Sequence, residues 1–150
     1  MSDITPSNST TFNSSFTPSS IEFRYFNHYF LNPNEPLVFI LAGSKTDYHH
    51  TDKILASLQS KGINSVCSYI SAHKNTLAVI ECINNVNKLF KKVIWVTVAG
   101  RSNALSGVVA ANTDFPVMAC PPFKDKVDMM VNINSTLQMP SKTPVMTVLD

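Results

Sequence analysis

The sequence contains no apolar run that approaches the roughly 20 residues a helix needs to cross a bilayer. It also lacks a charge excess, because 12 Lys and Arg residues nearly balance 10 Asp and Glu, for a formal net charge of +2. Nothing therefore favours a polyanionic partner such as nucleic acid. No charged segment followed by an apolar one marks a secretory signal. We expect a cytoplasmic protein with neither a membrane nor a nucleic-acid partner.

Cysteine is scarce, and its spacing excludes two further classes of protein. Cys67, Cys82 and Cys120 are far apart in the chain and form no C-x-x-C pair, so neither a disulfide framework nor a zinc site is predicted. Each lies in or beside an apolar run, which favours a small core residue over a nucleophile. A reducing compartment is the default for such a chain.

The composition that remains is that of one globular domain. The chain has 150 residues, 44% of them hydrophobic and 15% charged. Residues 1–20 are dominated by Ser, Thr and Asn, which predicts disorder. Residues 21–31 are rich in aromatics, and we expect them to dock on the domain or on a neighbouring subunit. The tract NPNEP ends this segment, so we predict an N-terminal segment over 1–35 and a domain over 36–150.

From Pro36 onward, apolar runs alternate with helical patterns. Strands are predicted at 36–42, 64–70, 92–99, 116–120 and 144–149, and helices at 47–61, 75–90, 103–112 and 125–138. Alternating strands and helices imply parallel pairing through right-handed crossovers. The predicted fold is a flavodoxin-like, doubly wound α/β sheet of order 2-1-3-4-5 in three layers. No closing helix follows the last strand, so we expect uncovered apolar side chains on the first and last strands.

Three loops at the ends of predicted strands contain most of the polar groups that converge. They are GSKTD (43–47), SAHK (71–74) and AGRSN (99–103). In a sheet of this order, loops after strands 1, 2 and 3 are neighbours at the edge where ligands bind. Gly43 and Ser44 before a helix suit an anion, although Ser44 or Asp47 taken alone is more simply explained as a helix cap. Neither a Walker loop nor a G-x-G-x-x-G fingerprint is present.

The charged residues of these loops indicate a site for an anion and a proton. Lys74 and Arg101 would add positive charge to the crevice, which suits a phosphate or a carboxylate. His73 is positioned to accept a proton at neutral pH, although a single His is more often a solvated loop residue. His49 and His50 are expected to be exposed residues of the first helical turn, not a metal pair, because adjacent helical positions point in two directions.

Five motifs in register resemble the phosphoribosylaminoimidazole carboxylase (PurE) family of purine synthesis. The motifs are GSKTD, SAHK, AGRSNALSGVVAANT, PVMACPP and LQMPSKTPVMTVL, and they cover about residues 37–149. The resemblance implies that His73 moves the proton at the carbon that is carboxylated. It implies that the ribose and the 5′-phosphate are bound by Ser44, Asp47, Ser71 and Lys74. It also implies that carbon dioxide or the new carboxylate is contacted by Gly100, Arg101 and Ser102. No metal and no cofactor are implied.

Details of the motifs resemble the branch of the family that carboxylates aminoimidazole ribonucleotide (AIR) directly with carbon dioxide. SAHK and AGRSN replace the SAHR and AGGAAH of the branch that rearranges an N-carboxylated substrate. The resemblance implies a homo-oligomer and a possible fusion to, or association with, another purine-pathway enzyme. Two alternatives stay open, namely an inactive or truncated phosphosugar-binding or subunit-interaction module, and a related pyridinium mononucleotide carboxylase. The family has a glycine where this chain has Lys142, so we expect strain there if its φ is positive.

Overall fold

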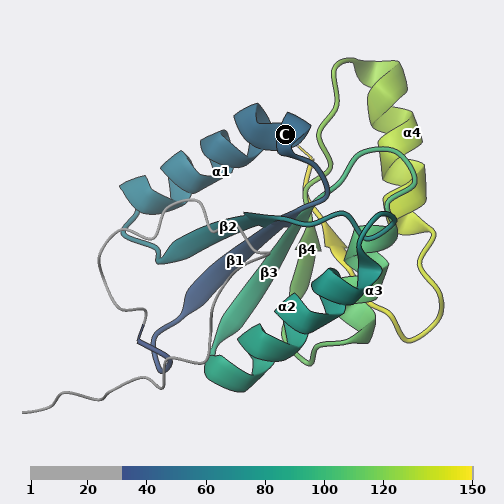
Figure 1. The fold of residues 1–150 in the computed structure, drawn as a ribbon. Coiled ribbons are helices and arrows are strands. Elements are labelled where there is room, and N and C mark those ends of the chain that lie inside the picture. Colours follow the sequence, from purple (N-terminus) through teal and green to yellow (C-terminus); the bar gives the residue numbers. More distant parts are fainter. Residues whose placement is uncertain (1–31, 150) are drawn as a thin grey trace, which may run out of the picture.

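Five parallel strands form one sheet with the order β2-β1-β3-β4-β5 in the computed structural model, which describes residues 32–149 (Figure 1). The strands are β1 (Leu37–Ala42), β2 (Ser65–Tyr69), β3 (Val93–Val98), β4 (Val117–Ala119) and β5 (Met146–Thr147). The helices are α1 (Tyr48–Ser60), α2 (Thr76–Leu89), α3 (Ala104–Ala111) and α4 (Lys126–Leu137), with a 3-10 turn η1 (Lys45–Asp47) before α1. The predicted flavodoxin-like topology is confirmed, whereas the predictions for residues 1–31 lie outside the described residues.

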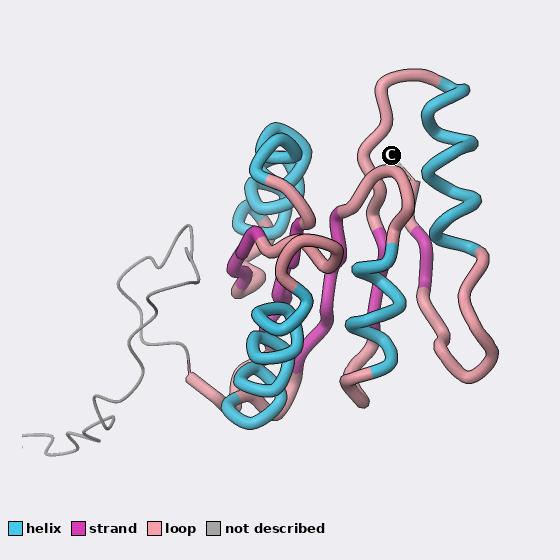
Figure 2. Tube along the Cα trace, turned by 45° about the vertical axis from the view of Figure 1, so that its right-hand side comes forward, coloured by secondary structure: helices cyan, strands magenta, loops and turns pink. Residues whose placement is uncertain are grey.

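The sheet separates two apolar clusters, because neighbouring residues of a strand point to opposite faces. On one face, Ile40 and Val96 pack with Leu55 of α1. On the other face, Trp95 and its neighbours pack under α2 and α3, and the Phe39 and Trp95 rings lie 4.7 Å apart. Figures 1 and 2 show α1 alone on its face of the sheet, with α4 beside α3 towards the β5 edge.

The prediction of uncovered strands is confirmed for the last strand and wrong for the first. Met146 of β5 and Val148 just after it are 49% and 40% exposed. Leu37 and Phe39 to Ala42 of β1 are buried, because helices cover this central strand on both faces. Ile94 of β3, on the face occupied by α1, is also 42% exposed. The uncovered apolar surface therefore lies on the face of the sheet that carries α1, where this helix does not reach.

Several element boundaries differ from the sequence prediction. Strand β5 pairs with β4 at Met146 and Thr147 alone, although the apolar pattern extends over 144–149. Helix α1 is preceded by a 3-10 turn, so its first regular residue is Tyr48. The φ of Lys142 is positive, at 64°, so the condition under which strain was expected at this residue is met. Cys67, Cys82 and Cys120 are buried, as predicted.

Candidate functional site

The three loops chosen from the sequence begin at the same level of the sheet. Ala42, the last residue of β1, is in register with Tyr69 of β2 and Val98 of β3. The Gly43 N–H donates to the Val98 carbonyl over 2.8 Å, and the Ile70 N–H donates to the Ala42 carbonyl over 2.8 Å. The carboxyl ends of three adjacent strands are thus bonded to each other, which is the place where ligands bind in such sheets.

The first loop is shaped by Ser44, which caps the 3-10 turn. Its Oγ accepts from the Thr46 N–H at 3.2 Å and lies 2.8 Å from the Thr46 hydroxyl oxygen. The capping reading of Ser44 is therefore correct, and one oxygen lone pair is occupied by this bond. A Cβ on Gly43 would meet Ala99 Cβ at 3.7 Å, which is ordinary contact. Packing thus leaves space for a side chain at Gly43.

Asp47 precedes α1, but its carboxylate makes no capping bond to the helix. The side chain is half-buried. Desolvation raises the pKa of this carboxyl above its usual 3.8, and the nearby His50 partly opposes the shift. A partly desolvated carboxylate at the strand edge is suited to accept a hydrogen bond from a hydroxyl group, such as that of a sugar.

His50 does not occupy the exposed position predicted for it. Its Nε2 lies 3.2 Å from the carbonyl oxygen of Cys120 and 3.5 Å from the Cys120 Sγ. Helical spacing explains the difference, because His50 lies one turn before the half-buried Ile54 and shares its inward-facing side of α1. His49 is exposed, as predicted. His50 therefore links α1 to the end of β4.

The second loop holds His73 in a tight turn between β2 and α2. The Lys74 N–H donates to Ser71 Oγ at 3.3 Å, and the Asn75 N–H donates to the Ser71 carbonyl at 2.9 Å. Asn75 then caps α2 through the Ala78 N–H. His73 and Lys74 are exposed. Ser71 thus fixes a turn from which an imidazole and an ammonium group can both reach a ligand.

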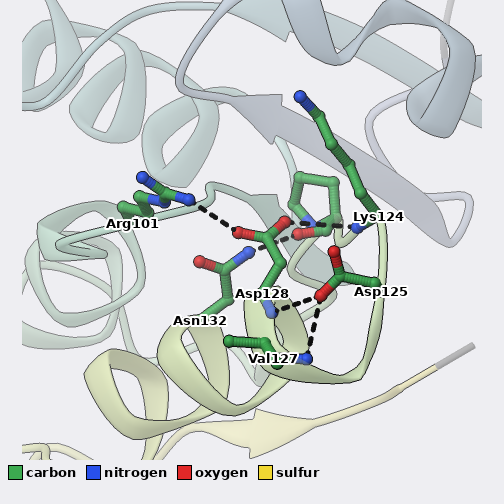
Figure 3. A network of polar contacts seen from close by, with 7 residues as sticks. Arg101, Lys124, Asp125, Val127, Asp128 and Asn132 are labelled. Carbon is green, nitrogen blue, oxygen red and sulfur yellow. Dashed lines mark hydrogen bonds and ion pairs between the residues drawn. The ribbon is translucent and has the colours of Figure 1, made fainter.

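The third loop contains an unusual backbone conformation. Ser102 has a φ of 53°, in the left-handed region that a residue with a side chain rarely adopts. A Cβ on Gly100 would meet only Asn132 Nδ2, at 3.9 Å. Arg101 donates from Nη2 to Asp128 Oδ1 at 3.3 Å (Figure 3). Gly100, Arg101 and Ser102 are therefore placed at the predicted edge, with Arg101 engaged by a carboxylate of α4.

Two further features of residues 32–149 concern the Cys82 thiol and the possible metal ligands. Burial, with a smaller contribution from Glu81, raises the pKa of Cys82 to about 12, so this thiol stays protonated. Among residues 32–149, no cluster of three or more His, Cys, Asp or Glu side chains could hold a metal ion. Within the same range, no helix is long and apolar enough to cross a bilayer.

Sequence reasoning missed Asp128 and His50 as neighbours of the site. The sheet order contained a signal for Asp128, because β3 and β4 are adjacent and their loops must be neighbours as well. A carboxylate in the first turn of α4, the helix that follows β4, could therefore have been matched with Arg101. For His50, the signal was its position four residues before Ile54, which places both side chains on the same side of α1.

Comparisons with known proteins agree with this arrangement of loops and strands. The sequence model of AIR carboxylase matches residues 37–150. The chain belongs to the AIR carboxylase family. It is 46% identical over 111 residues to the phosphoribosylaminoimidazole carboxylase of Archaeoglobus fulgidus, covering 74% of this chain and 60% of that protein. The crystal structure of Treponema denticola PurE superposes with a TM-score of 0.72 at 37% identity, over 77% of this chain and 73% of that one.

A bifunctional relative shows a second context for an AIR carboxylase domain. The Drosophila melanogaster phosphoribosylaminoimidazole carboxylase/phosphoribosylaminoimidazole succinocarboxamide synthetase is 40% identical over 113 residues. That match covers 75% of this chain and 26% of the fly protein. This chain thus spans less than two thirds of the Archaeoglobus and Drosophila relatives.

Proposed function

We propose that this chain carboxylates AIR with carbon dioxide to form carboxyaminoimidazole ribonucleotide, a step of purine biosynthesis. The observation that carries the proposal is the hydrogen-bonded junction of the three loops, which brings the Ser44 turn, His73 and Arg101 to one edge of the sheet. Membership of the AIR carboxylase family supports the same reaction.

The proposed roles follow the chemistry of each loop. Ser44, Asp47, Ser71 and Lys74 bind the ribose and the 5′-phosphate. The ammonium group of Lys74 and the hydroxyl group of Ser44 bind the phosphate, and the Asp47 carboxylate accepts from a ribose hydroxyl. Gly100, Arg101 and Ser102 contact carbon dioxide and the carboxylate that forms from it. The absence of a Gly100 side chain leaves space for this small ligand.

His73 would act as the proton acceptor. The aminoimidazole ring is electron-rich, and its carbon supplies the electron pair for the new bond to carbon dioxide. The same carbon then loses its proton to the His73 imidazole, which restores the aromatic ring. The protein need only hold the two reactants together, exclude water and accept this proton. No cofactor is required for the balance of atoms and electrons.

Three other functions compete with this proposal. An N-carboxylated imidazole ribonucleotide would be the substrate if the chain catalysed a rearrangement, but Lys74, Arg101 and Ala104 favour direct carboxylation. A pyridinium mononucleotide would fit the same phosphate site. A non-catalytic module would bind the phosphosugar and produce no carboxylated product.

We also propose that the chain acts as a homo-oligomer in the cytoplasm. The outer face of α4 supports the first part, because Val127 and Leu137 are 75% and 63% exposed and Met130 is 59% exposed. Apolar surface of this kind is usually buried against a partner. Association with another purine-pathway enzyme is a further possibility suggested by the fused domains of the Drosophila relative.

An absorbance assay separates these functions. The chain is mixed with AIR and bicarbonate, without ATP or added metal, and the ultraviolet spectrum is followed over time. Parallel reactions contain the N-carboxylated ribonucleotide or a pyridinium mononucleotide. Product formation in the reaction with AIR and bicarbonate, and in neither parallel reaction, supports the proposal. Turnover of only one of the other two substrates would refute it. AIR binding measured by calorimetry without turnover would identify the non-catalytic module.

A further inference from the structure

One face of α4 is lined by polar residues that contact the third loop of the candidate site. Asp128 accepts from Arg101 at 3.3 Å. One and two turns further along, Asn132 lies beside Gly100, and Ser135 Oγ accepts from the Asn103 N–H at 3.2 Å. The positions 128, 132 and 135 follow the helical repeat, so they share one face of α4. We call this the inner face of α4.

Asn103 is held most firmly by this face. It is buried, and its Nδ2 donates to Thr136 Oγ1 at 3.1 Å as well as to Ser106 Oγ at 2.7 Å. Its Oδ1 accepts from the Ser106 N–H and so caps α3. Asn103 therefore connects the third loop, α3 and α4 through buried hydrogen bonds.

The carboxylate of Asp128 is itself fixed in place (Figure 3). Its Oδ2 accepts from the Lys124 N–H at 3.2 Å, and Oδ1 is left for Arg101. Asp125 caps the same helix end through the Val127 and Asp128 N–H groups, each at 2.9 Å. The Asp128 side chain is 16% exposed, whereas that of Arg101 is 78% exposed. A rigid acceptor thus holds a guanidinium that otherwise extends into solvent.

The strained residue Ser102 lies between these two anchored positions. A left-handed φ of 53° in a residue with a side chain persists only where its surroundings hold it. Arg101 on one side is bonded to Asp128, and Asn103 on the other is bonded to Ser135 and Thr136. The inner face of α4 therefore holds both ends of the strained turn.

We propose that the inner face of α4 positions the turn 100–102 for catalysis, with Asp128 as a positioning residue that acts through Arg101. This inference rests on the proposed carboxylation. The contact with Asp128 engages one nitrogen of a group with five N–H donors, so other donors stay available to the forming carboxylate. Orienting the guanidinium beforehand lowers the cost of reaching the geometry in which it stabilises that charge.

A double-mutant cycle tests whether Asp128 acts through Arg101. Asp128→Asn removes the charge with little change of shape, and we expect kcat to fall about three- to fivefold with KM nearly unchanged, the scale of an exposed ion pair. In an Arg101→Gln background, the same substitution should have no further effect. Asp114→Asn, the same chemical change in a loop before β4, should leave activity at the wild-type value. Independent, multiplicative losses in the double mutant would overturn the proposal.

Trypsin cleavage provides a readout that does not depend on turnover. Trypsin cuts after Arg101 only when the turn 100–102 opens and this side chain leaves Asp128, so the cleavage rate follows the population of the opened turn. Asp128→Asn should accelerate this cut about three- to fivefold, with unchanged rates at other sites and in Asp114→Asn. Equal rates in all variants would overturn the inference. Faster cleavage in a chain that does not carboxylate AIR would support the anchoring by α4 and refute the proposed reaction alone.

Discussion

The N–H of Gly43 donates to the carbonyl of Val98 over 2.8 Å, so the first and third loops are joined at their first bond beyond the strands. The neighbouring bond from Ile70 to Ala42 adds the second loop. Because these are backbone bonds within the sheet edge, side-chain substitutions in the loops should change ligand contacts without separating the loops.

His73→Asn should remove nearly all turnover and leave AIR affinity within a small factor. The His73 imidazole is exposed and caps no helix, so its replacement should leave the turn intact. The substitution should therefore affect only the proton transfer in the transition state. We expect kcat to fall by about 10²- to 10⁴-fold. Steady-state kinetics and calorimetry give the two quantities, and a parallel loss of affinity and turnover would indicate a structural histidine.

Ser44→Ala and Lys74→Ala should weaken the binding of AIR and of inorganic phosphate in parallel. Each residue is proposed to bind the phosphate, and a charge-assisted hydrogen bond contributes about 1.5–3 kcal/mol. Calorimetry with both ligands measures the dissociation constants. Lys61→Ala, which removes an exposed ammonium group at the far end of α1, is the control and should change neither. Unchanged phosphate binding in the Ser44 and Lys74 variants would remove them from the site.

Gly100→Ala should lower activity without changing stability, whereas Gly62→Ala should lower stability without changing activity. A Cβ at Gly100 meets only ordinary contacts, so the fold should be unaffected, while the methyl group occupies the proposed carbon dioxide site and lowers turnover. Gly62 has a φ of 68° with open space around it, so alanine should cost about 1 kcal/mol of unfolding free energy and leave activity unchanged. Chemical denaturation and the absorbance assay provide both readouts.

Lys142→Gly should raise the free energy of unfolding by about 0.5–1 kcal/mol. The left-handed φ of 64° strains a residue with a side chain, and glycine relieves this strain, although its greater freedom in the unfolded chain returns part of the gain. Lys61→Gly is the matched control, because the φ of −99° at Lys61 is unstrained, and it should lower stability. Urea denaturation measures both, and a loss of stability in Lys142→Gly would contradict the prediction.

Asp47→Asn should increase stability at neutral pH while weakening AIR binding. Folding raises the pKa of Asp47 above its usual value of 3.8. At a pH between the unfolded-state pKa and the folded-state pKa, the folded chain therefore binds more protons than the unfolded chain. Stability from this group is therefore greatest below pH 3.8 and declines as pH rises through the folded pKa. Asparagine has no such cost and should remove this part of the pH dependence. Denaturation over a pH series tests it, and an unchanged slope would contradict the assignment.

The sheet was predictable because its strands are apolar on both faces and separated by helical patterns. Residues 37–42 and 93–98 contain almost no polar alternation, which fixes them as central parallel strands. The length of β5 was not predictable, because pairing depends on β4, whose own strand has only three residues. An apolar pattern indicates that a segment can form a strand, but it does not indicate how many residues of the neighbouring strand are available for pairing.

The positions of the site loops were predictable, but some of their partners were not. Strand ends locate Ser44, His73 and Arg101 at one edge once the order of strands is known. The contact of Arg101 with Asp128 joins residues 27 positions apart and depends on how α4 is rotated. Hydrophobic periodicity does not give that rotation, because the inner face of α4 is polar.

In most helices the polar residues face solvent and the apolar residues face the protein, but in α4 the inner face is polar and several apolar residues face solvent. A protein engineer who replaced the polar residues of the inner face of α4 would disrupt the anchored turn, whereas the apolar residues Val127, Met130 and Leu137 are in contact with solvent. Lysine or glutamate at these three positions should weaken the proposed self-association while leaving the hydrogen bonds of the inner face in place.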